Sequence, residues 1–178
     1  MNKAIALVVL AALVPLGALA QTVSPYGGQE QRSIKALSPD EVKAYLAGEG
    51  MGLAKAGELN HYPGPKHILA MADHLGLTAA QRARIEAAEK TMSATAVPRG
   101  RAIVDAEADL DGRFAAGTID AGSLRAATLH IAELQGRLRA AHLLAHIQTR
   151  AALDAGQIAM YDTMRGYDVN GDSAKHMH

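Results

Sequence analysis

Two long stretches of the chain carry helix-forming residues with few interruptions, and only a short turn separates them. The first runs from about residue 79 to 116 and the second from about 120 to 152, with Gly117, Thr118 and Ile119 between them. Both are rich in alanine, which has the highest helix propensity and lets helices approach closely. A short connection makes two helices antiparallel neighbours. The sequence therefore predicts an all-α fold built on a helical hairpin.

The start of the first long helix is marked by a short pattern that returns later in the chain. In the segment LTAAQ, Thr78 can cap the helix and Gln81 occupies its third position, which is the spacing of a capping box. The segment LDAGQ has the same arrangement, with Asp154 as the cap and Gln157 at the third position. These residues predict helices that begin at about residues 79 and 155.

Shorter helices are expected around the hairpin. Ser38 and the residues after it form another capping box, which predicts a helix over about 39–47. Further short helices are expected over about 67–75 and 155–166. Pro98 lies inside the first long helix, and we expect it to kink or briefly break that helix because proline has no amide hydrogen. The sequence therefore predicts an extended hairpin with short flanking helices.

One face of the second long helix is apolar at helical spacing and needs a partner helix. Other apolar side chains of residues 141–152 lie off this seam, so this segment is expected to be buried from a second side by another subunit. The sequence therefore predicts a homodimer. The seam residues are Ile131, Leu134, Leu138, Ala141, Ala145, Gln148 and Ala152.

The first twenty residues have the pattern of a secretory signal. Lys3 precedes an apolar run, and Ala18, Leu19 and Ala20 form a small-residue cleavage site, so cleavage is expected after Ala20. We expect export to the periplasm. The expected divisions are the signal peptide (1–20), a flexible leader (21–37), one helical domain (38–167) and a disordered polar tail (168–178).

Composition excludes several classes of function. The whole chain has 18 basic and 18 acidic residues, so nucleic acid is not an expected partner. It has no cysteine, which excludes disulfides and thiolate ligands, so a soft metal ligand must be methionine and a borderline one histidine. No nucleophile and base stand at a catalytic spacing, and no glycine-rich phosphate loop follows a strand. We therefore expect a protein that is not an enzyme.

The signal, the alanine-rich hairpin without cysteine and the repeated L-T-x-x-Q pattern resemble the Spy/CpxP family of periplasmic proteins, also called the LTXXQ-motif family. The first segment, Leu77–Gln81, matches fully, whereas Leu153–Gln157 has Asp154 in place of threonine. The resemblance covers about residues 65–166. It implies a hooked four-helix hairpin that dimerises and protects unfolded periplasmic proteins or reports envelope stress. The related heavy-metal sensors bind nickel, cobalt, copper or zinc.

The histidines and methionines decide between these roles. His142 and His146 are four residues apart on the second long helix, so both imidazoles lie on one face and can share a metal ion. His67 lies on an earlier helix, and Met51 in a glycine-rich loop offers a thioether for a soft ion. The predicted ligands are Met51, His67, His142 and His146, with Met71 and His74 as alternates.

These residues favour a protein of heavy-metal resistance or envelope stress that binds copper first, then zinc, nickel or cobalt. Two other functions fit the same scaffold. One is a metal-independent chaperone that holds unfolded clients without ATP, and the other is a sensor-inhibitor that docks on a membrane-bound regulator. Because capping boxes encode only the scaffold, metal binding must separate the first function from the others.

Overall fold

The computed structural model describes residues 24–167, and the predicted signal peptide and tail lie outside this range. The chain divides into two units, residues 1–30 and 31–178. The described part of the first unit, residues 24–30, contains a turn and the start of a 3-10 helix, η1 (Gln29–Gln31). The second unit contains all the α-helices of the described residues, and no strand occurs among them.

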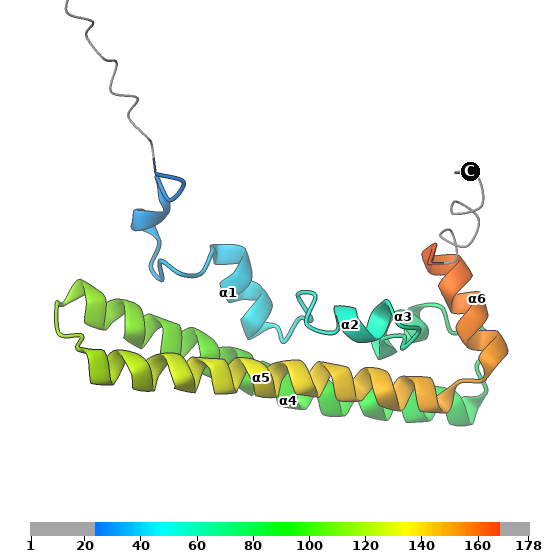
Figure 1. The fold of residues 1–178 in the computed structure, drawn as a ribbon. Helices are drawn as coiled ribbons and strands as arrows, with labels where there is room; N and C mark the ends of the chain where they lie inside the picture. The colour runs from blue at the N-terminus through cyan, green and yellow to red at the C-terminus, as the bar shows by residue number, and fades with distance from the viewer. Residues whose placement is uncertain (1–23, 168–178) are drawn as a thin grey trace, which may run out of the picture. The chain divides into compact units, whose positions relative to one another are not determined.

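Two long helices, α4 (Ala79–Ala115) and α5 (Ala121–Ala152), form the predicted antiparallel hairpin. They lie side by side along their length in Figure 1 and make the most extensive contact between elements. The all-α prediction and the bounds of both long helices are confirmed. No helix within residues 24–167 combines the length and the apolar character that a membrane span requires.

Four short helices surround the hairpin: α1 (Pro39–Leu46), α2 (Lys55–Glu58), α3 (Pro65–Ala70) and α6 (Ala155–Arg165). Helices α1 and α3 pack on α4, and α2 packs on α5. Helix α3 differs from the expected helix over 67–75. It begins earlier because Pro65 occupies its first turn, and after Ala70 the chain continues as turns as far as Gly76.

Pro98 lies inside α4, which continues through it, so of the two expected outcomes, a kink or a brief break, the break does not occur. The proline removes one amide donor from the helix. Nearby, the guanidinium Nη1 of Arg99 donates to the Thr95 carbonyl oxygen at 3.1 Å, an additional bond on the turn that contains the proline. Packing of α1 on this part of α4 also holds the helix together.

Gly100 marks the closest approach between α1 and α4. A Cβ atom at this position would lie 1.9 Å from the carbonyl oxygen of Tyr45, so any larger residue would displace one backbone from the other. Upstream of α1, Ile34 and Leu37 are buried against Val104. A flexible leader was expected as far as residue 37, but its last residues carry apolar side chains that pack on α4.

The two segments that predicted helix starts face each other. Both capping boxes form as expected, since Thr78 accepts from the Gln81 amide and Asp154 from the Gln157 amide. The side-chain amides of Gln81 and Gln157 also bond to each other, with Nε2 to Oε1 distances of 2.8 and 3.2 Å. The pattern that starts each helix therefore also ties α6 to α4.

The buried seam of α5 differs in part from the predicted one. Ile131, Leu138 and Ala145 are buried as expected. Gln148 is exposed, whereas His142 and Thr149, each one residue from a predicted seam position, are buried. The predicted seam contained the apolar or neutral residue of each turn. In the structure α5 is rotated so that the adjacent polar residues are buried instead. A histidine in the hairpin interface is therefore a finding of the structure.

Candidate functional site

All four predicted ligands border the same hollow, between α5, α3 and the loop that follows α1. Met51, His67, His142 and His146 line a cavity of about 440 Å³. The same four side chains line an adjoining cavity of about 460 Å³ on the side of α2. Residues distant in sequence therefore meet in one place, as the metal-site prediction requires.

His142 lies in the hairpin interface and is 3% exposed. Its Nε2 atom is buried and has no hydrogen-bond partner within the described residues. Burial lowers the pKa of this imidazole, and the nearby His146 lowers it further. The neutral ring is therefore favoured, which is the form that binds metal ions.

His146 is oriented by a backbone carbonyl. Its Nδ1 lies 2.7 Å from the carbonyl oxygen of Tyr62. A carbonyl can only accept, so Nδ1 carries the proton and a neutral ring keeps its lone pair on Nε2. This is the support that metal-binding histidines usually receive from their surroundings.

The Nε2 edge of His146 is left clear by Gly64. A Cβ atom at Gly64 would lie 3.0 Å from both Cε1 and Nε2 of the ring. The backbone of Gly64 has φ −79° and ψ 145°, values that any residue can adopt. Glycine at this position is therefore explained by the space beside the imidazole rather than by the turn.

Met51 and His67 complete the border from more exposed positions. Met51 is 40% exposed and has φ +42°, a left-handed conformation that is uncommon outside glycine. In the same loop, a Cβ atom on Gly50 would lie 3.7 Å from Nδ1 of His142, so the loop passes next to the buried ring. His67 projects from α3 and is also exposed.

Glu58, at the end of α2, is the residue of this site that the sequence did not indicate. Its carboxylate lies between the two accessible histidines, 3.6 Å from Nδ1 of His67 and 3.6 Å from Nδ1 of His146. It also accepts from the hydroxyls of Tyr161 and Tyr167. Because these partners are up to 109 residues away, no local pattern could have identified it.

The partners of Glu58 connect the histidines to α6. Tyr161 is fully buried, and its pKa is raised by burial, by its hydrogen bond to Glu58 and by the charge of that carboxylate. The neutral phenol therefore remains a donor across the ordinary pH range. Arg165 of α6 lies 3.7 Å from the same carboxylate. The carboxylate is thus held by groups from one end of the molecule while it faces the imidazoles.

The alternate ligands are placed elsewhere. Met71 packs against the buried cluster of Ile68, Leu75, Ile85 and Tyr161, and His74 is exposed; neither borders the two cavities. His130 is exposed on α5. His61 is also exposed, and its Nδ1 lies 2.7 Å from the buried carboxylate of Asp162.

The donor set suits a soft ion better than a hard one. Within residues 24–167, no three histidine, aspartate or glutamate side chains stand close enough together to hold a metal ion by themselves. A site here must therefore include a thioether or draw its ligands together on binding. An imidazole nitrogen without a hydrogen-bond partner, a second imidazole held by a backbone carbonyl and a methionine fit Cu(I), which favours soft ligands.

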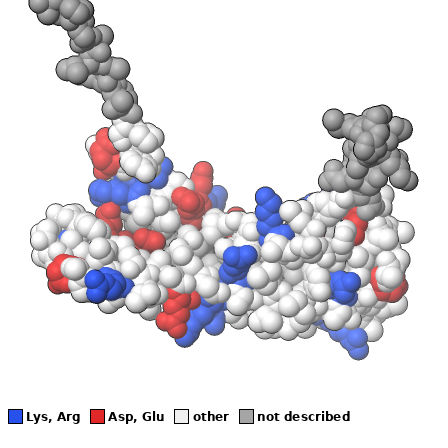
Figure 2. Space-filling model, in the orientation of Figure 1, with Lys and Arg blue, Asp and Glu red and all other residues white. Residues whose placement is uncertain are grey.

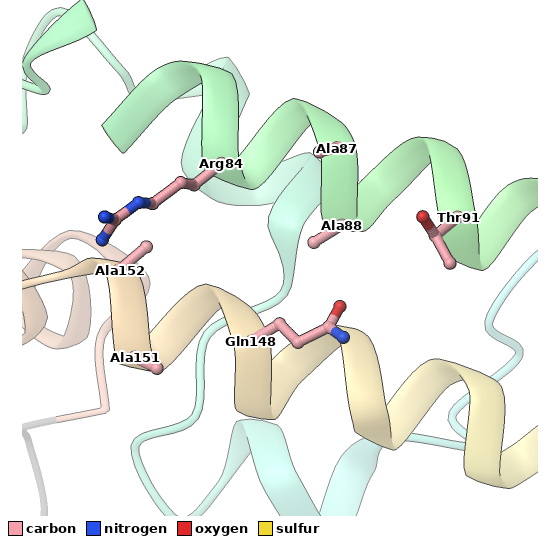
Figure 3. Close-up of a pocket in the computed structure, with 7 residues that line it drawn as sticks. All are labelled: Arg84, Ala87, Ala88, Thr91, Gln148, Ala151 and Ala152. Atoms are coloured by element: carbon pink, nitrogen blue, oxygen red, sulfur yellow. The ribbon is translucent and has the colours of Figure 1, made fainter. Parts of the chain in front are cut away.

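A second surface feature is a shallow groove between the long helices, shown in Figure 3. It is lined mainly by small side chains, with Arg84, Thr91 and Gln148 as its polar members. On the space-filling face in Figure 2, basic and acidic side chains are dispersed and neither sign forms a continuous patch. The groove is lined by Arg84, Ala87, Ala88, Thr91, Gln148, Ala151 and Ala152.

Comparisons with known proteins were made for the whole chain. No protein-family model, curated protein or solved structure matches it. The chemistry of the site is therefore argued from its own residues.

Proposed function

We propose that this chain is an exported, non-enzymatic protein that binds metal ions through histidine and methionine, with copper as the preferred metal. The observation that carries the proposal is the meeting of Met51, His67, His142 and His146 around one cavity. The four come from α3, α5 and the loop before α2, and packing at one place does not require imidazoles from two helices. Metal binding would explain why these three histidines and one methionine lie together.

The structure of the site supports reversible binding of a soft ion. His142 offers a buried imidazole whose pKa is lowered, His146 offers an imidazole held at Nδ1 by the Tyr62 carbonyl, and Met51 offers a sulfur on a loop bounded by glycines. With its predicted secretory signal and its resemblance to the Spy/CpxP family, the chain would act in the periplasm, in heavy-metal resistance or envelope stress. Zinc, nickel and cobalt are the next candidates.

Direct titration tests the proposal. The exported protein, with its tail residues His176 and His178 replaced by alanine, is titrated with Cu(I), Cu(II), Zn(II) and Ni(II) by calorimetry. A variant with His142→Gln and His146→Gln is compared with His130→Ala, which changes an exposed histidine of the same helix. We expect one ion per chain, lost in the double variant and retained in the control. No binding tighter than about 10 μM Kd would reject the metal site.

A chaperone for unfolded clients is the second candidate, and the groove between α4 and α5 favours it. The groove is lined mainly by alanine, and Leu144 and Ile147 of α5 are 55% and 52% exposed. Unpartnered apolar surface is typical of a protein that binds other chains or a second copy of itself. Suppression of client aggregation that is unchanged by metal, and lost in Leu144→Gln/Ile147→Gln, would establish this function.

A further inference from the structure

A second methionine borders the candidate metal cavity from the side of the hairpin. Met92, on α4, is partly buried and lines the cavity with Met51, His142 and His146. The sequence did not mark it, because a methionine inside a long helix usually belongs to the core. The cavity is thus bordered by two thioethers from different elements and by the imidazoles of α5.

Core packing gives Met92 little explanation. Three clusters of buried apolar residues occur among residues 24–167, and Met92 is a member of none of them. Its side chain also borders a smaller hollow of about 100 Å³ between α4 and α5. It therefore has space on two sides, and the unbranched, flexible thioether can turn toward either hollow.

The donor atoms that border these cavities differ in which metal ions they prefer. Thioether sulfur favours Cu(I), whereas Zn(II) takes imidazole, carboxylate and thiolate. Met92 borders only the first cavity, which Glu49 and Glu89 also line, whereas Glu58 lines the adjoining cavity on the side of α2. Met51 borders both cavities, so imidazoles and carboxylates offer Zn(II) a set of donors that does not need Met92. His142 and His146 border both cavities. The presence or absence of the second thioether therefore decides how strongly the region prefers Cu(I).

We propose that Met92 is a metal ligand that makes the site selective for Cu(I) over Zn(II). This inference rests on the proposed metal-binding function and adds a ligand and a selectivity to it. In this arrangement Met92 supplies a sulfur from the rigid hairpin, and Met51 supplies one from the loop. The imidazoles serve both ions, so loss of Met92 weakens Cu(I) binding alone.

The test compares Met92→Leu with Met71→Leu, both of which preserve side-chain volume. Met71 is the matched control because it packs in another cluster and borders neither cavity. The background carries His176→Ala, Met177→Leu and His178→Ala, which removes the soft donors of the tail. Cu(I) affinity is measured without oxygen against a chromophoric Cu(I) chelator, and Zn(II) affinity against a zinc chelator.

We expect Met92→Leu to weaken Cu(I) binding by about tenfold or more, equal to about 1.4 kcal/mol, and Zn(II) binding by less than about threefold. Met71→Leu should change neither. X-ray absorption at the copper edge gives a second readout, because Met92→Leu should remove one sulfur from the shell around Cu(I). A variant that merely disturbed the fold would weaken both ions equally.

Failure of this inference differs from failure of the proposed function. If His142→Gln/His146→Gln abolishes Cu(I) binding while Met92→Leu leaves it and the sulfur shell unchanged, Met92 is not a ligand and the metal site stands without it. An equal loss of Cu(I) and Zn(II) affinity in Met92→Leu also rejects the assignment. If the unsubstituted protein binds neither ion, both proposals are wrong.

Discussion

The paired amides of Gln81 and Gln157 make a measurable prediction about how the helices are joined. Each side chain completes a capping box, and in addition the two share hydrogen bonds of 2.8 and 3.2 Å. Gln81 also donates to the carbonyl of Ala152, and Gln157 to that of Leu75, at 3.0 and 3.2 Å. The capping bonds belong to each helix alone, whereas the shared bonds exist only while α6 lies against α4.

The expected energies follow from these bonds. A net hydrogen bond contributes about 0.5–1.5 kcal/mol, with the lower half of that range suited to a partly exposed pair. Gln81→Leu loses its capping bond, its bond to a carbonyl and both shared bonds, so we expect it to lower the free energy of unfolding by about 2–3 kcal/mol. Gln157→Leu should cost a similar amount. The double variant should cost about 1–2 kcal/mol less than the sum, because the shared bonds are lost only once.

Urea unfolding followed by the helical circular dichroism signal measures all four corners of this cycle. The matched control pairs Gln81→Leu with Ser123→Ala, since Ser123 completes the separate capping box of α5. Those two losses should add to within about 0.5 kcal/mol. A coupling below about 0.3 kcal/mol between the two glutamines would refute the argument, because the amides would then act only as independent caps.

Three further predictions follow from close contacts and from charge. Gly64→Ala should weaken metal binding several-fold with little loss of stability, as calorimetry and urea unfolding can check, because its Cβ would crowd the Nε2 edge of His146. Gly100→Ala should cost about 1–3 kcal/mol in urea unfolding, because its Cβ would overlap the Tyr45 carbonyl oxygen. The lowered pKa of His142 means that the unfolded chain binds more protons, so the metal-free protein should lose stability as the pH falls below the ordinary value of 6.5. His142→Leu should flatten this dependence; an unchanged slope would contradict it.

The helices could be predicted from the sequence because their signals are local. A capping box spans four residues, and Thr78, Asp120 and Asp154 each accept the amide bonds that the pattern requires. The sequence left open whether Pro98 would kink or break α4, because the outcome depends on packing by α1, which no local pattern contains. The pairing of Gln81 with Gln157 escaped prediction for the same reason, since it joins residues 76 positions apart.

The residues that border the candidate site could be predicted from the sequence, but the residues that support them could not. Histidine and methionine stand out by type and spacing in a chain without cysteine. Glu58 did not, because nothing around a lone carboxylate on a one-turn helix indicates that two tyrosines and two histidines converge on it. The predicted seam of α5 was wrong at His142 because its residues were selected as apolar or neutral. A buried imidazole is an exception to the rule that apolar residues fill a helix interface.

That violation is itself an argument about function. Leucine would fill the position of His142 at lower cost than an imidazole whose Nε2 has no partner. Around the same cavity, Met51 has a left-handed backbone conformation. Position 64 is a glycine although its backbone conformation would allow any residue. The other left-handed residue among positions 24–167 apart from glycines, His61, contacts a buried carboxylate and so has a local reason. Unfavourable local features such as these are concentrated at functional sites in proteins, and here the three lie around one cavity. A ligand bound between these residues would relieve the orphaned nitrogen and use the open edge of His146, and so would account for all three at once.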